Sequence, residues 1–399
     1  MLKYPGHEVA LDAALRDWRA GGPGCFESAL EIDRHWETPP RRETLQVAYE
    51  FANPTGDPAT ETITAQLPGM TLNLRSPVEL APVKIPKPWG EEIWYTAIEA
   101  RGESEILTAG GSLPLATYLS LAPERLCKSS PVVLLKVLNP RPEPVTGELY
   151  FEVHEEKREV YVVTHIDPAA WPAGTGYVRL GMDQTLRAEY ADDAAFRAAF
   201  LAAVSEYEAV CRRVDAGDAT ATGQQAACRE NVERFSVLQP LRQADVVVVP
   251  TWLPHSLQHG VRVVEFQTPT YERHIISSSQ RVLTQDQWDS AAAIARMQLD
   301  PPAKVDFEVI APGVERIVAF DEFAVWRVQI AAERETAIPD ELPYAVCMVI
   351  TGAIDVVAGG IALSLTAEHA AFVPGDAAGK TLVNRHSQTA ICLVAAPGL

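Results

Sequence analysis

The pattern of apolar and polar positions changes from a helical period to a strand period early in the chain. Leu11, Leu15 and Trp18 recur at helical spacing. The first 40 residues are therefore predicted to be helical, ending at Pro39-Pro40. The runs LQVAYEF, ETITAQL and MTLNLRSPV then alternate apolar and polar positions between Asn-Pro, Gly-Asp-Pro and Pro-Gly turns. Such runs predict short strands.

Helices and a buried strand are predicted in the middle of the chain. LATYLSLAPERL predicts a helix, and the continuous apolar run VVLLKVLN predicts a strand buried on both faces. GELYFEVHEEKREVYVV predicts two strands around a turn near residues 155–157. A longer helix follows, with Asp192 and Asp193 placed to cap its start. Its apolar stripe consists of Phe196, Phe200, Ala203, Tyr207 and Val210. ATATGQQAA is expected to break this helix, and CRENVERF predicts a second, short one.

Strands dominate the last part of the chain. ADVVVVP and VRVVEFQ predict strands, and Thr284 with Gln287 forms a capping box for a last helix that ends at the linker Pro301-Pro302. From residue 305 onward the pattern is almost all short strands, and IDVVAGGIAL predicts a hairpin. The sum is a mainly-β protein of two β-rich modules, with helices inserted in the first. Many short strands with Gly and Pro turns favour a sandwich or barrel over a parallel sheet.

The amino-acid composition limits the kinds of molecule that the protein is expected to bind. The 399 residues carry a net charge of −19, which repels phosphate backbones and anionic lipid surfaces, so neither nucleic acid nor membrane is an expected partner. Six scattered cysteines without a CxxC pair indicate reduced thiols. The N-terminus lacks the apolar stretch of a signal peptide, so a cytoplasmic protein is expected. A small-molecule substrate fits this picture best, and the oligomeric state is left open.

Two histidines and two glutamates form the candidate chemical site. Glu152 and His154 are two residues apart on a predicted strand, so their side chains leave the same face. Glu159 lies on the following strand, where a hairpin would return it beside them. His255 follows a strand that ends at Pro250, on the predicted rim of a barrel. Converging imidazoles and carboxylates bind a divalent metal such as Zn²⁺, with Mn²⁺ or Fe²⁺ also compatible.

The same residues have a plainer interpretation. Residues 152–159 include six charged side chains and are equally compatible with a solvated charged hairpin, and a histidine after a strand is often structural. His259 lies on the same short loop as His255 and is the alternative ligand.

A resemblance to the type I mannose-6-phosphate isomerases, zinc-dependent double cupins, ties these segments together. It begins at Lys87-Pro88-Trp89-Gly90 with Glu92-Ile93-Trp94, and continues through GGSLPLATYLSLAPERL and VVLLKVLNPRPEP. The family's Q-V-H metal strand is similar to Glu152-Val153-His154, and its G-K-x-E-x-W-Y strand to Lys157-Arg158-Glu159-Val160-Tyr161. Its P-A-G-T-x-H-A motif is similar to Pro250-Thr251-Trp252-Leu253-Pro254-His255-Ser256, and its E-x-Q and T-Y-R motifs to Glu265-Phe266-Gln267 and Thr270-Tyr271-Glu272-Arg273.

The resemblance implies two cupin-type, jelly-roll-like β-barrels with a helical insertion in or after the first. The domains expected are an N-terminal extension of unclear role (1–80), a catalytic cupin (81–302) with a helical insertion at about 190–240, and a metal-free cupin (303–399).

The resemblance also assigns candidate roles to individual residues. The metal ligands it implies are Glu152, His154, Glu159 and His255. Two further residues are candidate catalytic groups. Lys136 is a candidate acid/base or oxyanion partner, or else its ammonium extends to solvent at the strand end. Arg273 is a candidate enediolate stabiliser, or else a surface ion-pair partner.

Three departures from the family concern the phosphate group of its substrate. Glu152 replaces the family's glutamine, which with Glu159 makes a divalent site formally neutral. The segment between His154 and Glu159 is far shorter than in the family. Glu272 separates Tyr271 from Arg273, so Arg273 is expected to face away from the site.

Three functions therefore remain open. The first is a metal-dependent aldose–ketose isomerase of mannose 6-phosphate or a related sugar phosphate, acting through an enediolate. The second is an isomerase or epimerase of an unphosphorylated sugar. The third is a non-catalytic cupin that binds a sugar or a metal.

Overall fold

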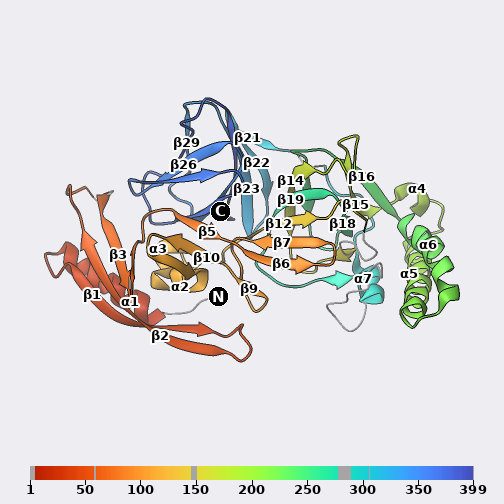
Figure 1. The fold of residues 1–399 in the computed structure, drawn as a ribbon, viewed down its shortest axis with the longest axis horizontal. Helices are drawn as coiled ribbons and strands as arrows, with labels where there is room; N and C mark the ends of the chain where they lie inside the picture. The colour runs from red at the N-terminus through yellow and green to blue at the C-terminus, as the bar shows by residue number, and fades with distance from the viewer. Residues whose placement is uncertain (1–4, 58–59, 145–150, 277–288, 305, 399) are drawn as a thin grey trace. The chain divides into compact units, whose positions relative to one another are not determined.

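The chain forms two compact units in the computed structural model, which describes residues 5–57, 60–144, 151–276, 289–304 and 306–398 (Figure 1). The first unit combines Met1–Val83, Trp94–Lys136 and Asp306–Leu399, and the second combines Lys84–Ile93 and Val137–Val305. Both ends of the chain thus belong to the same unit. The three consecutive domains expected from the sequence stay a prediction.

The first unit begins with a helix and an antiparallel sheet in the order β1-β2-β3-β4. These elements are α1 (Pro5–Arg19), β1 (Cys25–Arg34), β2 (Arg41–Ala52), β3 (Thr62–Leu67) and β4 (Met70–Asn73). Leu11 and Leu15 are buried as predicted, but the prediction of helix up to residue 40 is wrong. The helix stops before the Gly21-Gly22-Pro23-Gly24 segment, and CFESALEIDR then alternates with a strand period.

A nine-stranded sheet in the order β11-β10-β5-β28-β25-β30-β23-β22-β21 joins distant parts of the sequence in the first unit. Its early strands are β5 (Val78–Ala81), β10 (Glu105–Thr108) and β11 (Gly111–Pro114). Its late strands are β21 (Glu308–Ala311), β22 (Val314–Ala319), β23 (Phe323–Ile330), β25 (Tyr344–Thr351), β28 (Ala370–Pro374) and β30 (Ala390–Pro397). Leu80 pairs with Ala370, so β5 lies inside the sheet between β10 and β28.

A four-stranded sheet in the order β24-β29-β26-β27 shares an apolar core with the nine-stranded sheet. It contains β24 (Glu335–Ala337), β26 (Ala353–Ala358), β27 (Ile361–Thr366) and β29 (Thr381–Val383). The predicted hairpin is confirmed, because Ala358 pairs with Ile361 and both glycines between them have positive φ. The unit also contains β8 (Ile98–Glu99), β9 (Gly102–Glu103), α2 (Leu115–Leu121) and α3 (Pro123–Cys127).

The second unit is built from two sheets around one apolar core. The six-stranded sheet has the order β17-β14-β19-β12-β7-β6, and the five-stranded sheet has the order β16-β15-β18-β13-β20. The first sheet contains β6 (Val83–Lys87), β7 (Gly90–Trp94), β12 (Leu134–Pro140), β14 (Glu159–Ile166), β17 (Val246–Val249) and β19 (Val261–Gln267). The second contains β13 (Glu152–Val153), β15 (Gly176–Met182), β16 (Ser236–Leu241), β18 (His255–Leu257) and β20 (His274–Ile275). Val163, Val178 and Val263 meet in the core between them.

Helices follow β15 and pack together in the second unit (Figure 1). They are α4 (Gln184–Arg187), α5 (Asp193–Asp215), α6 (Ala219–Glu233) and, later in the chain, α7 (Ser290–Arg296). The predicted stripe of α5 is confirmed as buried, and Asp192 caps the helix by accepting from the Ala195 N–H. The predicted break and second helix are confirmed, but the break lies earlier, because α5 ends at Asp215 and α6, capped by Asp218, already includes ATATGQQAA. The predicted capping box at Thr284 lies outside the described residues.

These elements confirm the mainly-β fold class with a helical insertion. Strands also prevail in the charge-rich segment around Glu159, as predicted. The six cysteines are free thiols. Among the described helices, none combines the length and the apolar character that crossing a membrane requires.

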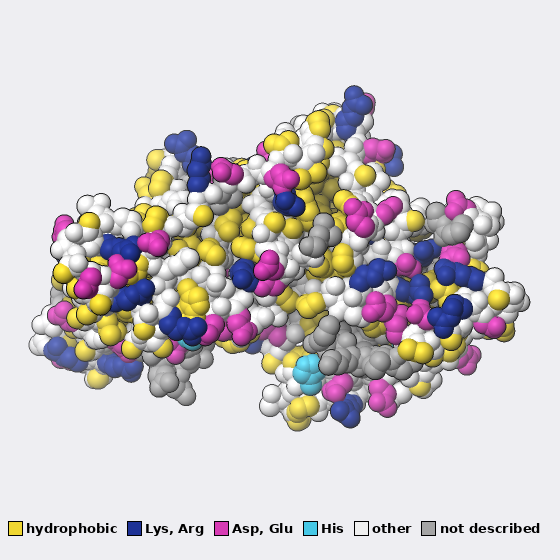
Figure 2. All heavy atoms as spheres, turned by 180° about the vertical axis from the view of Figure 1, so that it is seen from behind, with side chains coloured by type: hydrophobic (Ala, Val, Ile, Leu, Met, Phe, Trp, Pro, Cys, Tyr) yellow, Lys and Arg dark blue, Asp and Glu magenta, His cyan; other side chains and the backbone are white. Residues whose placement is uncertain are grey.

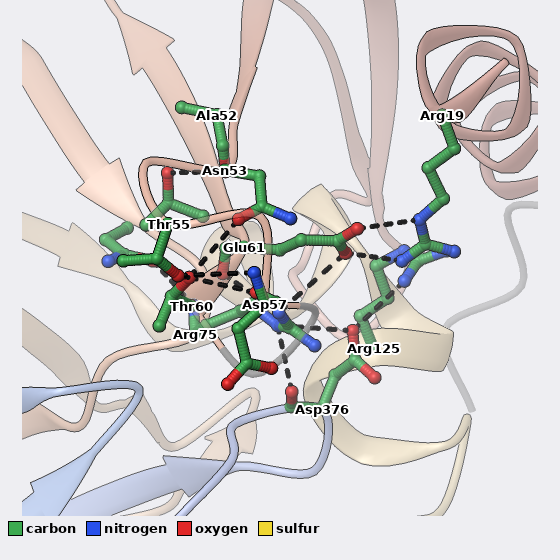
Figure 3. Close-up of polar contacts among 12 residues, drawn as sticks. Arg19, Ala52, Asn53, Thr55, Asp57, Thr60, Glu61, Arg75, Arg125 and Asp376 are labelled. Carbon is green, nitrogen blue, oxygen red and sulfur yellow. Dashed lines mark hydrogen bonds and ion pairs between the residues drawn. The ribbon is translucent and has the colours of Figure 1, made fainter.

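An ion-pair network fastens the N-terminal segment within the first unit (Figure 3). Arg19 of α1 binds both carboxylate oxygens of Glu61, at 2.5 and 3.0 Å. Arg75 donates to the Glu61 carbonyl at 2.9 Å and to the Asp376 carbonyl at 3.0 Å. Arg125 of α3 pairs with the Asp376 carboxylate at 3.0 Å. Basic and acidic side chains also lie beside one another on the face drawn in Figure 2, so much of the charge is locally compensated.

Glu8 of α1 gives a prediction for the pH dependence of stability. Its side chain is 8% exposed, and burial raises its pKa from 4.5 to about 7. Because the folded state holds this proton more tightly, the stability is full below about pH 4.5 and falls as the pH rises towards 7. The loss amounts to up to about 3 kcal/mol. Glu8→Gln is therefore expected to raise the thermal unfolding midpoint at pH 8 and to change it little at pH 4.5.

The control is Asp17→Asn, which removes an exposed acid from the same helix. Its melting profile from pH 4.5 to 8 should follow that of the unmodified protein. An equal gain for both variants at pH 8 would show that net charge, and not the burial of Glu8, sets the pH dependence.

Candidate metal centre

The candidate ligands lie where the two sheets of the second unit approach each other at one end. Glu152 of β13 pairs directly with His255, the first residue of β18. His154 follows β13 immediately, and Glu159 begins β14 in the other sheet. The hairpin predicted between the two strands is therefore wrong. The turn after His154 is a corner that carries the chain from one sheet to the other.

Three of the four side chains form a compact, buried group. The ligand atoms of Glu152, His154 and His255 all lie within 4.8 Å of one another. Glu159 faces both imidazoles, with carboxylate oxygens 3.5 Å from His154 Nε2 and 3.3 Å from His255 Nε2. His154, His255 and Glu159 are nearly inaccessible to solvent. The interpretation of residues 152–159 as a solvated hairpin is therefore wrong.

Backbone carbonyls orient both histidines. His154 Nδ1 lies 3.0 Å from the Glu272 carbonyl oxygen, and His255 Nδ1 lies 3.0 Å from the Leu253 carbonyl oxygen. A carbonyl only accepts, so each of these contacts places a ring proton on Nδ1, and Nε2 of each ring faces the carboxylates. Metal-binding histidines are held by outer hydrogen bonds of this kind.

Glu159 is surrounded by further polar groups that the sequence did not single out. Lys157 Nζ lies 2.5 Å from Glu159 Oε1, and the Tyr161 hydroxyl donates to Glu159 Oε2 at 2.5 Å. Burial alone would raise the pKa of Glu159, but Lys157, His154 and His255 hold it well below its ordinary value. Glu159 is therefore ionised at neutral pH. Burial lowers the pKa of His255, and the neighbouring Glu159 and Glu152 outweigh this and raise it.

The two predicted catalytic residues have different positions. Arg273 Nη1 lies 3.9 Å from Glu152 Oε2, and its side chain is 10% exposed, so the expectation that Arg273 faces away is wrong. It precedes β20 in irregular backbone, where the alternation of a strand does not apply. Lys136 is half-buried on β12, the strand between β19 and β7. Its catalytic role stays a prediction.

The alternative ligand His259 lies apart from this group. Its ring stacks on Trp171 with a centroid separation of 4.7 Å, and its carbonyl accepts from Trp171 Nε1 at 2.7 Å. The structure therefore brings His255, rather than His259, to Glu152 and His154.

The sequence does not predict the roles of Lys157 and Tyr161 beside Glu159. The available signal for Tyr161 was its spacing from Glu159, because residues two apart share one side of a strand, whereas Lys157 lies just before β14 in irregular backbone. Lys157 changes the charge of the centre, since it offsets one of the two carboxylates. The formal neutrality expected from the ligands alone therefore omits a buried cation.

The donor set fits a divalent metal ion. His255 Nε2 faces Glu159 Oε2 at 3.3 Å, a separation at which a proton or a cation lies between the two atoms. His255 Nε2 and Glu152 Oε2 are buried and make no hydrogen bond to the described residues. Imidazole nitrogens with carboxylate oxygens are ligands for Zn²⁺, Mn²⁺ and Fe²⁺. Fold and site together define a mainly-β protein with a candidate metal centre in its two-sheet unit.

Several solved structures with this fold are mannose 6-phosphate isomerases. The Bacillus subtilis protein is 14% identical, with a TM-score of 0.58 over 80% of this chain and 99% of the other. The Salmonella typhimurium protein bound to its substrate, f6p, and zinc is 12% identical, with a TM-score of 0.61 over 81% and 100%. A third, bound with zinc and yttrium, is 11% identical, with a TM-score of 0.61 over 81% and 100%.

Comparison by sequence gives no further relative. No family model matches the chain, and no curated protein matches it. At 11–14% identity the structural likeness shows the fold, and the chain has the cupin-type fold of these isomerases.

Proposed function

We propose that this protein is a metal-dependent aldose–ketose isomerase acting on mannose 6-phosphate or a related sugar phosphate. The single observation that carries the proposal is the buried group of Glu152, His154 and His255 in a protein with the fold of isomerases that bind zinc and f6p. Glu159, 3.3 Å from His255, is proposed as the fourth ligand.

The reaction moves a proton between C1 and C2 of the sugar through an enediolate. A divalent ion held by the four ligands would polarise the sugar oxygens and stabilise the negative charge of the enediolate. The guanidinium of Arg273, beside Glu152, is placed to attract a developing oxyanion. Lys157 keeps Glu159 ionised, and Lys136 remains the proposed acid/base group.

A second candidate is an isomerase or epimerase of an unphosphorylated sugar. The observation that favours it is Glu152, which adds a negative charge where the family has a glutamine. A carboxylate at this position weakens the attraction of the centre for an anionic substrate. The positive charges of Lys157 and Arg273 oppose this effect, so the preference between a phosphorylated and an unphosphorylated sugar must be measured.

The test combines metal analysis with two parallel assays. Purified protein is expected to contain about one equivalent of a divalent metal, and to lose its activity when a chelator removes the metal. Mannose 6-phosphate and mannose are assayed side by side with saturating metal. Turnover of mannose alone would favour the second candidate, and stoichiometric metal without turnover of either would contradict both in favour of a non-catalytic cupin.

Glu152→Gln is expected to raise the ratio of kcat/KM for mannose 6-phosphate over that for mannose. The substitution keeps the size of the side chain and one coordinating oxygen but removes a unit of negative charge. In a site of low effective dielectric this charge is worth on the order of 1–4 kcal/mol to an anion several ångströms away. Metal affinity should fall at the same time, because a carboxylate is the better partner of a divalent cation.

The control for this substitution is Glu156→Gln, an exposed glutamate on the neighbouring turn. It should change neither the ratio nor the metal affinity. An unchanged ratio in Glu152→Gln would end the claim that Glu152 disfavours phosphate, and an unchanged metal affinity would remove Glu152 from the ligands.

A further inference from the structure

Trp252 has a strained backbone next to the candidate metal centre. Its φ is +62°, in the left-handed region that is uncommon for any residue other than glycine and an outlier for a bulky one. Such a conformation persists only where the surrounding structure holds it, and it is most frequent at functional sites. Trp252 lies three residues before His255, on the turn between β17 and β18.

The backbone of Trp252 is fixed on both sides. Its N–H donates to the carbonyl oxygen of His154 at 2.7 Å, and its carbonyl accepts from the Gln298 N–H at 2.7 Å. Both hydrogen bonds depend on the direction of the peptide groups, which the left-handed turn sets. Trp252 therefore touches a candidate ligand through its main chain and not through its ring.

The ring of Trp252 contacts two flat, polar groups. The His274 ring stacks on it with a centroid separation of 5.6 Å and an interplanar angle of 15°. The Arg296 guanidinium carbon lies 4.0 Å from the ring centroid, within cation–π range. We call these three residues the Trp252 stack.

Carboxylates hold the outer members of the stack. Arg296 pairs with Glu155 at 2.6 Å, and His274 Nε2 lies 3.3 Å from Glu272 Oε1. The second oxygen of Glu272 accepts from the N–H groups of Glu155 and Glu156, at 2.9 and 3.1 Å. The stack is thereby connected to the corner that follows His154.

Two hydrogen bonds that orient His154 come from this one cluster. Its carbonyl is held by the Trp252 N–H, and its Nδ1 is held by the Glu272 carbonyl. The stack connects the residues that make these two hydrogen bonds, because His274 contacts both the Trp252 ring and Glu272. An imidazole held at its backbone carbonyl and at Nδ1 points Nε2 in one direction.

We propose that Trp252 is a positioning residue for His154, resting on the metal centre of the proposed function. The stack stabilises the left-handed backbone of Trp252, and the N–H placed by that backbone sets the direction of the His154 imidazole. The substitution of an outer partner of a metal ligand typically lowers metal affinity 10- to 100-fold. Trp252 should therefore act on metal affinity first, and on catalysis only through it.

The test compares substitutions that separate the ring from the backbone. Full-length protein freed of metal is titrated with Zn²⁺ in competition with a chromophoric chelator. Trp252→Phe keeps an aromatic ring in the stack and should bind Zn²⁺ nearly as tightly as the unmodified protein. Trp252→Ala loses the ring and retains the strain, so its Kd should rise about 10- to 100-fold. Trp252→Gly also loses the ring but adopts positive φ freely, so its Kd should rise about tenfold less than that of the alanine variant.

Trp171→Ala is the matched control, because Trp171 also stacks on a histidine of the same unit but contacts His259 instead of His154. It should lower the melting temperature and leave the Kd for Zn²⁺ within about twofold, since no outer partner of a ligand is lost. A merely structural role for Trp252 would give both alanine variants the same pattern and would overturn the proposal. An equal rise of the Kd for Zn²⁺ in Trp252→Ala and Trp252→Gly would overturn the claim that the left-handed backbone of Trp252 orients His154. Tight Zn²⁺ binding by the unmodified protein without sugar turnover would contradict the proposed function alone, and absent Zn²⁺ binding would overturn both.

Discussion

His255→Ala is expected to lose most of its bound metal and nearly all of its activity while keeping its fold. His255 Nε2 is buried against Glu159, and the imidazole is the group that a metal between Glu152 and His154 would reach from β18. Loss of a residue that only hydrogen-bonds a metal ligand already lowers metal affinity 10- to 100-fold. The loss of a direct ligand should therefore lower metal affinity by at least about a hundredfold. Metal analysis and circular dichroism of the purified variant measure the two effects separately.

His259→Ala is the matched control for this experiment. His259 lies on the same segment, four residues further on, and stacks on Trp171. Its removal should leave the metal content unchanged. If instead His255→Ala retains stoichiometric metal and His259→Ala loses it, the ligand assignment must be exchanged between the two histidines.

A chain that ends at Pro302 is expected to be insoluble or unstable. The nine-stranded sheet would lose β21, β22, β23, β25, β28 and β30, and only β5, β10 and β11 would remain. β5 would then present an unpaired edge where β28 now lies, and exposed edges of this kind promote aggregation. Val133 would also lose the hydrogen bond from its N–H to the Tyr344 hydroxyl, 2.8 Å long.

The comparison is a chain that ends at Pro397, which retains every strand of the sheet. It should be as soluble as the full-length protein in expression and size-exclusion experiments. A soluble, active fragment ending at Pro302 would show instead that the strands before residue 115 do not require their late partners.

The fold class could be predicted because local patterns were strong. The stripe of α5, the glycine hairpin of β26 and β27, and the apolar run of β12 each depend on a few neighbouring residues. A prediction failed where the low helix propensity of single residues was given more weight than capping and packing. In α6, Gly223, Thr220 and Thr222 disfavour a helix, but a capped helix packed on α5 tolerates them.

The residues of the candidate site could be predicted, but the path of the chain between them and their contacts could not. Glu152, His154 and His255 could be named because their types and order suggest metal binding. The sequence could not show that the chain turns a corner between two sheets after His154. It also could not show that Arg273 returns to Glu152, because the irregular segment before β20 breaks the alternation that a strand would impose. The strain at Trp252 depends on tertiary contacts alone.

The pairing of β5 with β28 has a consequence for the order of events during synthesis. Leu80 and Ala370 are neighbours in the sheet, and β30, which ends at Pro397, lies between β25 and β23. The first unit therefore cannot complete its sheet until β30 has been synthesised, whereas the second unit is fully synthesised by residue 305. Throughout that interval β5 lacks its partner β28, and this unpaired edge of the nascent chain is exposed to chaperones and to aggregation.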